Sequence, residues 1–209
     1  MSDPHGLDLA PVLQTTLETA MVGTAMILLI SCRPPVRNAA LALLVLAVIG
    51  RVAMQPIPNV QPVTVLVMLG AVRLGALRGA SIGILAAYLS NLALGGGAWT
   101  VVQALSWAVI GSLTGIVVSR IEGRGFYLAT LLAGLLYGAL VSIPLGFEAW
   151  LHGLPFDLLH ALGNITVAVW IVPFVDGALL HIGDWTIEEP WRNSRLDTSA
   201  CSRALRPLR

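Results

Sequence analysis

The sequence contains no lysine and few charges of any kind. All 12 basic residues among the 209 are arginine, and charged residues make up 11% of the chain against 56% hydrophobic residues. A soluble domain has roughly a quarter charged residues, so this composition excludes an ordinary soluble surface. The absence of lysine also excludes a Walker-type phosphate loop, which needs a Gly-Lys-Ser/Thr sequence. Any ATP hydrolysis linked to this protein would therefore occur in another chain.

Cysteine and net charge are also scarce. The two cysteines, Cys32 and Cys201, lie too far apart for a metal-site or disulfide spacing. A formal net charge of +1 gives no bulk attraction for nucleic acid, and the start, MSDPHGLDLA, has no basic region typical of a signal peptide. The apolar segments contain no paired-acid motif or nucleophile elbow. We therefore expect no enzyme, no cofactor and no metal site.

Long apolar segments dominate what is present. They cover approximately residues 14–32, 38–54, 63–77, 79–95, 99–119, 125–147 and 156–182. Continuous apolar blocks of about 17–25 residues can cross a membrane as helices, whereas a β-barrel would alternate apolar and polar residues. We predict an all-α polytopic membrane protein. The third block is short, and the first is diluted by Glu18 and several threonines, so it either spans the membrane or lies on its surface.

The arginines predict the orientation of these spans. All except Arg51 lie after blocks one, three, five and seven, whereas the loops around 55–62, 95–98 and 148–155 contain none. Arginine-rich loops stay in the cytoplasm. We therefore expect a multi-pass protein of the cell membrane, with residues 183–209 as a cytoplasmic polar tail and the three arginine-free loops outside.

The segment GRVAMQPIPNVQPVT, residues 50–64, interrupts the apolar pattern with Arg51, Asn59 and Gln61. An arginine at mid-membrane costs about 2.5–3.5 kcal/mol on insertion scales, and less near an interface. Prolines prevent a regular helix there, and non-helical backbone at membrane depth requires surrounding protein or a water-filled cavity. Arg51 could extend to the interface at the end of its helix, but the three polar residues together favour an outward-facing ligand pocket.

Later blocks supply more candidates for this pocket. The segment SNLALGGGAWTVVQALSW, residues 90–107, places Asn91, Trp99, Gln103 and Trp107 around an outer turn. An aromatic surface with a few amides is typical of a site for a ring-bearing ligand. Asn164 lies in the outer third of the last block, where it either contacts the ligand or bonds across helices.

Other polar residues have simpler interpretations. Asp176, in the inner half of the last block, either pairs with a cytoplasmic-side arginine or belongs to a coupling element. Glu148, His152, Asp157 and His160 have an irregular spacing that favours an ordinary polar loop over a metal site.

Two motifs, PNVQPVT and SNLALGGGAWT, together with QALSWAVIGSLTG and a last segment with the pattern GN…W…P, resemble a known family. It is the substrate-binding S component of energy-coupling factor (ECF) vitamin transporters, and the cobalamin-type members are the most similar. The resemblance covers about residues 38–182. It implies a six-helix bundle over residues 37–182, preceded by an extension, residues 1–36, with an extra helix.

The resemblance also implies a function. Such a protein captures a vitamin or related micronutrient from outside, here with a corrinoid favoured. It delivers this ligand through a transmembrane coupling subunit driven by two ATPase subunits. A stand-alone secondary transporter is the alternative, but it would favour several intramembrane acids and an internal repeat. The sequence shows only Asp176 and no repeat.

Docking on a coupling subunit needs small residues, because these let helices approach closely. The docking helix of the family often carries an Ala-x-x-x-Ala pair, which the segment 38–54 lacks. We expect docking through small residues of two ridges, with internal packing as the other interpretation. These residues are Ala47, Gly50, Gly79 and Gly83.

Overall fold

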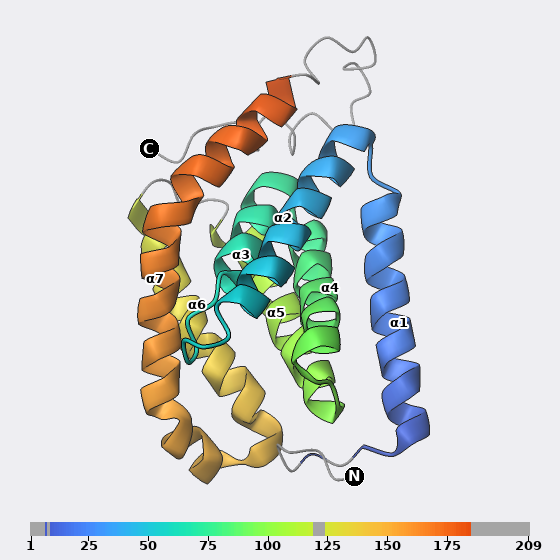
Figure 1. The fold of residues 1–209 in the computed structure, drawn as a ribbon, viewed down its shortest axis with the longest axis vertical. Helices are drawn as coiled ribbons and strands as arrows, with labels where there is room; N and C mark the ends of the chain where they lie inside the picture. Colours follow the sequence, from blue (N-terminus) through green and yellow to red (C-terminus); the bar gives the residue numbers. More distant parts are fainter. Residues whose placement is uncertain (1–6, 8, 119–123, 185–209) are drawn as a thin grey trace.

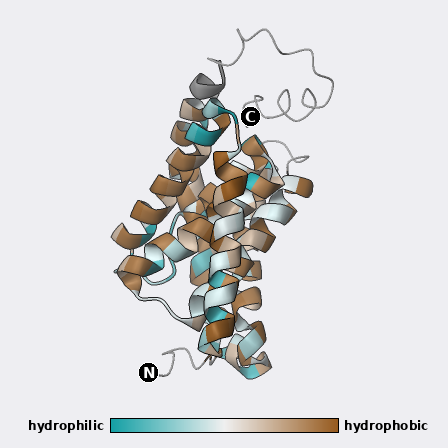
Figure 2. Cartoon of the chain, turned by 90° about the vertical axis from the view of Figure 1, so that its right-hand side faces the viewer, coloured by the Kyte–Doolittle hydropathy of each residue, from teal (hydrophilic) through white to brown (hydrophobic). Residues whose placement is uncertain are grey.

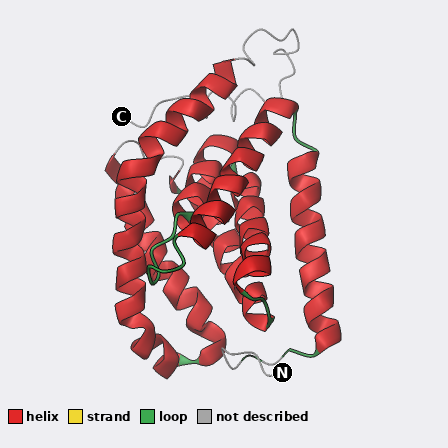
Figure 3. Cartoon of the chain, in the orientation of Figure 1, coloured by secondary structure: helices red, strands yellow, loops and turns green. Residues whose placement is uncertain are grey.

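The computed structural model describes residue 7 and residues 9–118 and 124–184, and all regular structure in this part of the chain is helical (Figure 3). The helices are α1 (Pro11–Ile30), α2 (Pro34–Ala53), α3 (Val63–Leu74), α4 (Ala76–Leu94), α5 (Ala98–Ile116), α6 (Arg124–Ser142), the short 3-10 helix η2 (Ile143–Leu145) and α7 (Phe147–Asp184). Six of them, all but α3 and η2, are long and apolar enough to cross a membrane. The prediction of an all-α polytopic membrane protein is confirmed at this level.

Hydrophobic residues cover much of the helices, with hydrophilic ones interspersed (Figure 2). Large hydrophobic side chains such as Leu92, Trp170 and Phe174 are 83%, 71% and 77% exposed. A soluble protein would not leave so much apolar surface in water. The polar residues of the described helices are instead largely turned inward.

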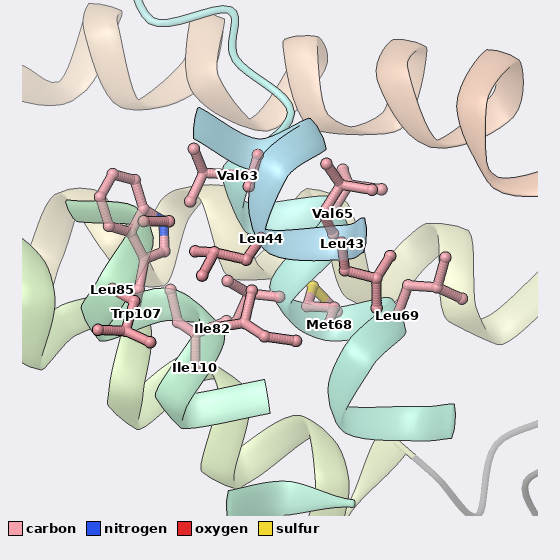
Figure 4. Close-up of a cluster of buried hydrophobic side chains, with 14 of the residues drawn as sticks. Leu43, Leu44, Val63, Val65, Met68, Leu69, Ile82, Leu85, Trp107 and Ile110 are labelled. Atoms are coloured by element: carbon pink, nitrogen blue, oxygen red, sulfur yellow. The ribbon is translucent and has the colours of Figure 1, made fainter. Parts of the chain in front are cut away.

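Helix α3 is the centre of the bundle. Ten of its 12 residues are buried, and its side chains Val63, Val65, Met68 and Leu69 pack against Leu43 and Leu44 of α2, Ile82 and Leu85 of α4, and Trp107 and Ile110 of α5 (Figure 4). At 1.5 Å per residue it is about 18 Å long, too short to cross a hydrocarbon core of about 30 Å by itself. The non-helical segment 54–62 precedes it.

Helix α1 lies at the edge of the bundle, beside α4 (Figure 1). Only Ala25 and Leu29 of this helix are buried. A 20-residue apolar helix is nevertheless long enough to span a membrane. The N-terminal extension predicted from the sequence therefore contains a helix of membrane-spanning length.

Several connections between helices lie at the two ends of the bundle, whereas the α2–α3 connection lies nearer its middle (Figure 1). Figure 1 shows the α1–α2 connection at one end and the α4–α5 and α6–α7 connections at the opposite end. This arrangement matches the relative sides predicted from the arginines, and the cytoplasmic position of one end stays a prediction. Residues 148–155, predicted as a loop, are helical instead. They form the first turns of α7, because the chain reverses earlier, at η2 and Gly146, and Pro155 is accommodated inside the helix.

The four small residues predicted to dock on a coupling subunit pack inside the bundle. Ala47 is fully buried, and Gly79 and Gly83 are buried as well. Cβ atoms placed on Gly50, Gly79 and Gly83 would lie 2.4, 2.4 and 2.7 Å from atoms of Pro62, Ala71 and Trp107, respectively. These residues let neighbouring elements of the same chain approach closely. The structure therefore favours internal packing over the predicted docking surface, because the surface would need these positions to be accessible.

Candidate functional site

The last turn of α2 places Arg51 in a group of polar side chains inside the bundle. Its Nε donates to Oε1 of Gln61 at 3.0 Å. Its Nη1 donates to the Ser90 hydroxyl and, at 2.8 Å, to Oδ1 of Asn91. Its Nη2 donates to Oε1 of Gln103 at 3.2 Å. We name these five residues the Arg51 centre; Arg51 itself is 7% exposed.

The centre is assembled by the tight turn between α4 and α5. Gly95, with φ of 100°, ends α4 in a conformation that favours glycine, and the chain reverses within three residues. Asn91 in the last turn of α4 thereby faces the first turns of α5. Its Nδ2 donates to Oγ1 of Thr100 and to Oε1 of Gln103, both at 2.8 Å. These bonds fix the amide so that its oxygen points to the guanidinium.

The charge of Arg51 is not matched by a carboxylate. All its hydrogen-bond acceptors in the described part of the chain are neutral amide and hydroxyl oxygens. The guanidinium carbon also lies 5.1 Å from the centroid of the Trp107 ring, a cation–π distance. A guanidinium has five N–H donors, and four of them have partners here. The centre therefore holds a buried positive charge, and one N–H group of the guanidinium has no hydrogen-bond partner.

A second hydrogen-bonded chain adjoins the centre through Trp107. The indole Nε1 donates to Oγ1 of Thr64 at 3.1 Å, and this hydroxyl lies 3.0 Å from Nε2 of His160. Nδ1 of His160 lies 2.9 Å from the Asn59 carbonyl oxygen. A carbonyl only accepts, so Nδ1 carries a proton, and a neutral ring then accepts the Thr64 proton at Nε2. Every polar atom in this chain has a defined role.

Asn59 anchors the segment 54–62 to α7. Its φ of 56° is a left-handed conformation that asparagine tolerates better than most residues. Its Nδ2 donates to the Phe156 carbonyl at 3.0 Å, and a Cβ on Gly163 would lie 3.1 Å from Val60. Helix α7 thus covers the irregular backbone at Asn59 and Val60, whereas residues 55–58 are exposed. Asn59 holds the loop and is not among the hydrogen-bond partners of Arg51.

Tyr137 of α6 closes the centre on another side. Its ring stacks on Trp107 at 4.8 Å and on His160 at 5.0 Å between centroids. The residue is 7% exposed, and its hydroxyl makes no hydrogen bond of normal geometry. That hydroxyl interacts electrostatically with Arg51 and lies close to Gln103. A buried hydroxyl without a hydrogen bond of normal geometry therefore belongs to a ring that stacks on the same tryptophan as the guanidinium.

Two predicted site residues lie apart from this hydrogen-bonded group. Trp99 is half-buried and packs against the hydrophobic core. Asn164 is fully buried between α6 and α7, where its Nδ2 donates to the Thr130 carbonyl at 3.2 Å. Of the two interpretations of Asn164, the structure shows the bond across helices. Its Oδ1 has no hydrogen-bond partner.

The structure thus brings Arg51, Gln61, Asn91, Gln103 and Trp107 together, as the sequence suggested. It adds residues that sequence reasoning missed as parts of the site: Thr64, Ser90, Thr100, Tyr137 and His160. A hydroxyl or a tyrosine within an apolar helix gives little signal. The sequence signal for His160 was a polar ring within an apolar segment, but the polar residues Glu148, His152 and Asp157 before it suggested a surface loop.

The polar residues at the start of α7 form no metal site. Glu148 and His152 are exposed, whereas Asp157 and His160 are 8% and 2% exposed. The residues that the structure describes contain no group of three or more histidines, cysteines or acids able to hold a metal ion.

Arg73 and Asp176 form a buried ion pair that joins α3 to α7. The guanidinium donates to both carboxylate oxygens through Nε and Nη2. The two residues are 5% and 6% exposed. Such two-point arginine–carboxylate pairs fix geometry as well as charge. The interpretation of Asp176 as the partner of an arginine is confirmed.

No family model, curated protein or solved structure matches this chain. Its function is therefore inferred from residue chemistry and geometry.

Proposed function

We propose that this chain is the membrane-embedded substrate-binding component, or S component, of an ECF-type transporter. It captures a vitamin or related micronutrient, with a corrinoid favoured, and passes it to a transmembrane coupling subunit driven by two separate ATPases. The observation that carries the proposal is the Arg51 centre, in which a buried guanidinium meets three amide side chains beside Trp107 inside apolar helices. A few convergent polar groups in an apolar setting are typical of small-molecule sites.

The placement of these groups supports a role in ligand binding. Polar and charged side chains within membrane helices are costly, and they generally mark substrate pathways or sites. In the predicted orientation the centre lies toward the outer side, near the segment 54–62 and the α4–α5 turn. A scavenged nutrient arrives from that side.

The motifs that resemble the S-component family build this same centre. PNVQPVT provides Gln61 and Thr64, and SNLALGGGAWT provides Ser90, Asn91 and Thr100. The side chains from these two stretches meet around Arg51 and Trp107. Side chains of the two motifs, residues 58–64 and 90–100, thus join one hydrogen-bonded assembly, which supports a shared function for them.

The absence of lysine supports a division of labour. The chain cannot form a Walker-type loop, so active transport driven by ATP needs a separate ATPase. The ion pair with Arg73 also occupies both oxygens of Asp176, which removes the acid that a secondary transporter would use most readily.

One observation favours the secondary transporter as a second candidate. Asp157, 8% exposed in α7, has a carboxylate oxygen without a hydrogen-bond partner. Intramembrane acids of this kind serve as proton or ion sites in transporters.

Binding and uptake measurements separate the two candidates. The purified chain should bind its ligand in a panel of corrinoids, flavins and other vitamins, but vesicles containing it alone should not concentrate that ligand. Coexpression with a coupling subunit and ATPases should add concentrative uptake. Concentrative uptake by the chain alone, lost in Asp157→Asn, would refute the S-component proposal and establish the secondary transporter.

A matched pair of glutamines tests the site. Gln61→Ala should weaken ligand binding roughly tenfold or more, about 1.4 kcal/mol, because Gln61 orients Arg51. Gln55→Ala, an exposed glutamine of the same segment, should leave affinity unchanged. Equal affinities of both variants and wild type would place the site elsewhere.

A further inference from the structure

We infer that the ligand of the Arg51 centre carries an anionic group, with carboxylate or phosphate oxygens that bind between the Arg51 guanidinium and the Tyr137 hydroxyl. This inference rests on the proposed function and specifies the chemistry of the ligand. It follows from three features: a buried arginine without a carboxylate partner, N–H and O–H donors without partners, and acceptors that already serve the guanidinium.

The first feature is the charge. Arg51 is 7% exposed, and its hydrogen-bond partners, Gln61, Ser90, Asn91 and Gln103, are all neutral. Isolated buried charges are strongly unfavourable, and buried charges in proteins are paired. The other deeply buried arginine of the described chain, Arg73, follows this rule through its carboxylate partner. An anion supplied by a ligand would give Arg51 the partner that the described chain does not provide.

The second feature is the unused hydrogen-bonding capacity. One of the five N–H groups of Arg51 has no partner, and the buried Tyr137 hydroxyl has none either. Both groups adjoin the Trp107 ring, on which Tyr137 stacks at 4.8 Å between centroids and from whose centroid the guanidinium carbon lies 5.1 Å. Unpaired buried donors are costly, and an acceptor between them would satisfy both.

The third feature is that each acceptor of the Arg51 centre already accepts a hydrogen bond from the guanidinium. Oε1 of Gln103 accepts from both Arg51 and Asn91. The Thr64 hydroxyl accepts from Trp107 and donates to His160. The groups without hydrogen-bond partners are one N–H of the positively charged Arg51 and the Tyr137 hydroxyl. Carboxylates and phosphates match this because their ionised oxygens only accept, whereas a cationic group would be repelled by Arg51.

Matched ligand pairs test the inference on the purified full chain in lipid nanodiscs. Each pair differs in its charged group: nicotinate and nicotinamide, pantothenate and panthenol, biotin and its amide, riboflavin 5′-phosphate and riboflavin. Acetate and inorganic phosphate serve as minimal anions, and the buffer contains neither carboxylate nor phosphate. We expect one or more anionic members to bind at least about tenfold more tightly than the neutral partner and to raise the unfolding temperature.

Variants with matched controls assign the effect to residues. Arg51→Gln should abolish the anion preference, and Tyr137→Phe, which keeps the ring stacked, should reduce it severalfold. Arg37→Gln on the same helix as Arg51, and Tyr127→Phe on the same helix as Tyr137, should keep it. If Arg51→Gln does not fold, the binding of the ligand pairs to wild type and to Tyr137→Phe still tests the inference.

The outcomes separate this inference from the proposed function. Neutral members that bind as tightly as anionic ones, or a preference that survives Arg51→Gln, would overturn the inference and leave nutrient binding standing. Stabilisation by phosphate or acetate that depends on Arg51, without binding of any nutrient, would support the anion site and count against the proposed function. No response of the wild type to any anion would overturn the inference.

Discussion

The ion pair between Arg73 and Asp176 gives a quantitative prediction about stability. Both side chains are less than a tenth exposed, and the guanidinium binds both carboxylate oxygens. Removing one partner of a buried pair typically costs 3–5 kcal/mol, because the remaining charge stays buried without compensation. We expect Arg73→Met alone, or Asp176→Leu alone, to lower the free energy of unfolding by about 3–5 kcal/mol.

The double variant should recover most of this loss. Apolar residues of similar volume often replace a buried ion pair at little cost or with a gain. We expect Arg73→Met combined with Asp176→Leu to lie within about 1–2 kcal/mol of wild type, which gives a coupling energy of several kcal/mol in the double-mutant cycle. The difference between the effect of the double variant and the sum of the two single effects gives the interaction energy between Arg73 and Asp176.

Unfolding by a denaturing detergent in mixed micelles, followed by circular dichroism and tryptophan fluorescence, measures these free energies. Arg37→Met, which removes a half-buried arginine at the start of α2, controls for loss of charge as such and should cost less than about 1 kcal/mol. Single variants that each cost under about 1 kcal/mol, or a double variant that costs the sum of the singles, would refute this reasoning.

Two other predictions concern helix packing and orientation. Gly83→Ala should lower the free energy of unfolding by about 1–3 kcal/mol, because its Cβ would lie 2.7 Å from Cβ of Trp107. Gly23→Ala, with open space around it, should raise the free energy of unfolding by about 0.5–1 kcal/mol. Detergent unfolding of both variants checks this contrast, and equal effects would contradict it. In a chain whose cysteines are replaced by serine, Gly96→Cys should react with an impermeant maleimide added outside intact cells and Leu77→Cys should not. The opposite labelling pattern would invert the topology and move the Arg51 centre to the inner side.

The helices could be predicted because lipid imposes a simple requirement on sequence. Each long apolar block became a helix, since only internal hydrogen bonds satisfy the backbone there. The start of α7 could not be predicted in the same way. Residues 148–155 were predicted as a loop between two apolar blocks, but the chain reverses at Gly146 and the helix continues through Pro155. Such a choice depends on what neighbouring helices can accommodate.

The centre could be predicted in part for the same physical reason. Polar side chains such as Arg51, Gln61, Asn91 and Gln103 are costly within apolar membrane segments. Their presence therefore predicted that they lie together in one site. Tyr137 joined them only in three dimensions, since a tyrosine in an apolar helix is ordinary on any face. The sequence pattern does not show which residues tertiary packing brings to a site.

The small residues show the opposite limit of sequence reasoning. A ridge with Gly83 indicates close approach between helices, but it does not say which helix approaches. In this chain the partner is Trp107 of α5. The partner of Asp176 was open for a similar reason, because several arginines were available, and the proximity of α3 and α7 selected Arg73. Tertiary contacts decide both cases.

The 103 positions that separate Arg73 from Asp176 in the sequence also set an order of events during synthesis on the ribosome. At about 5–20 residues per second, α7 emerges about 5–20 s after α3. During that interval α3 is too short to cross the bilayer and carries a charge whose carboxylate partner has not yet been made. It would wait at the membrane surface or beside the insertion machinery until α7 arrives. Burial of the central helix is then a late step of assembly, completed by the helix that is translated last among those described.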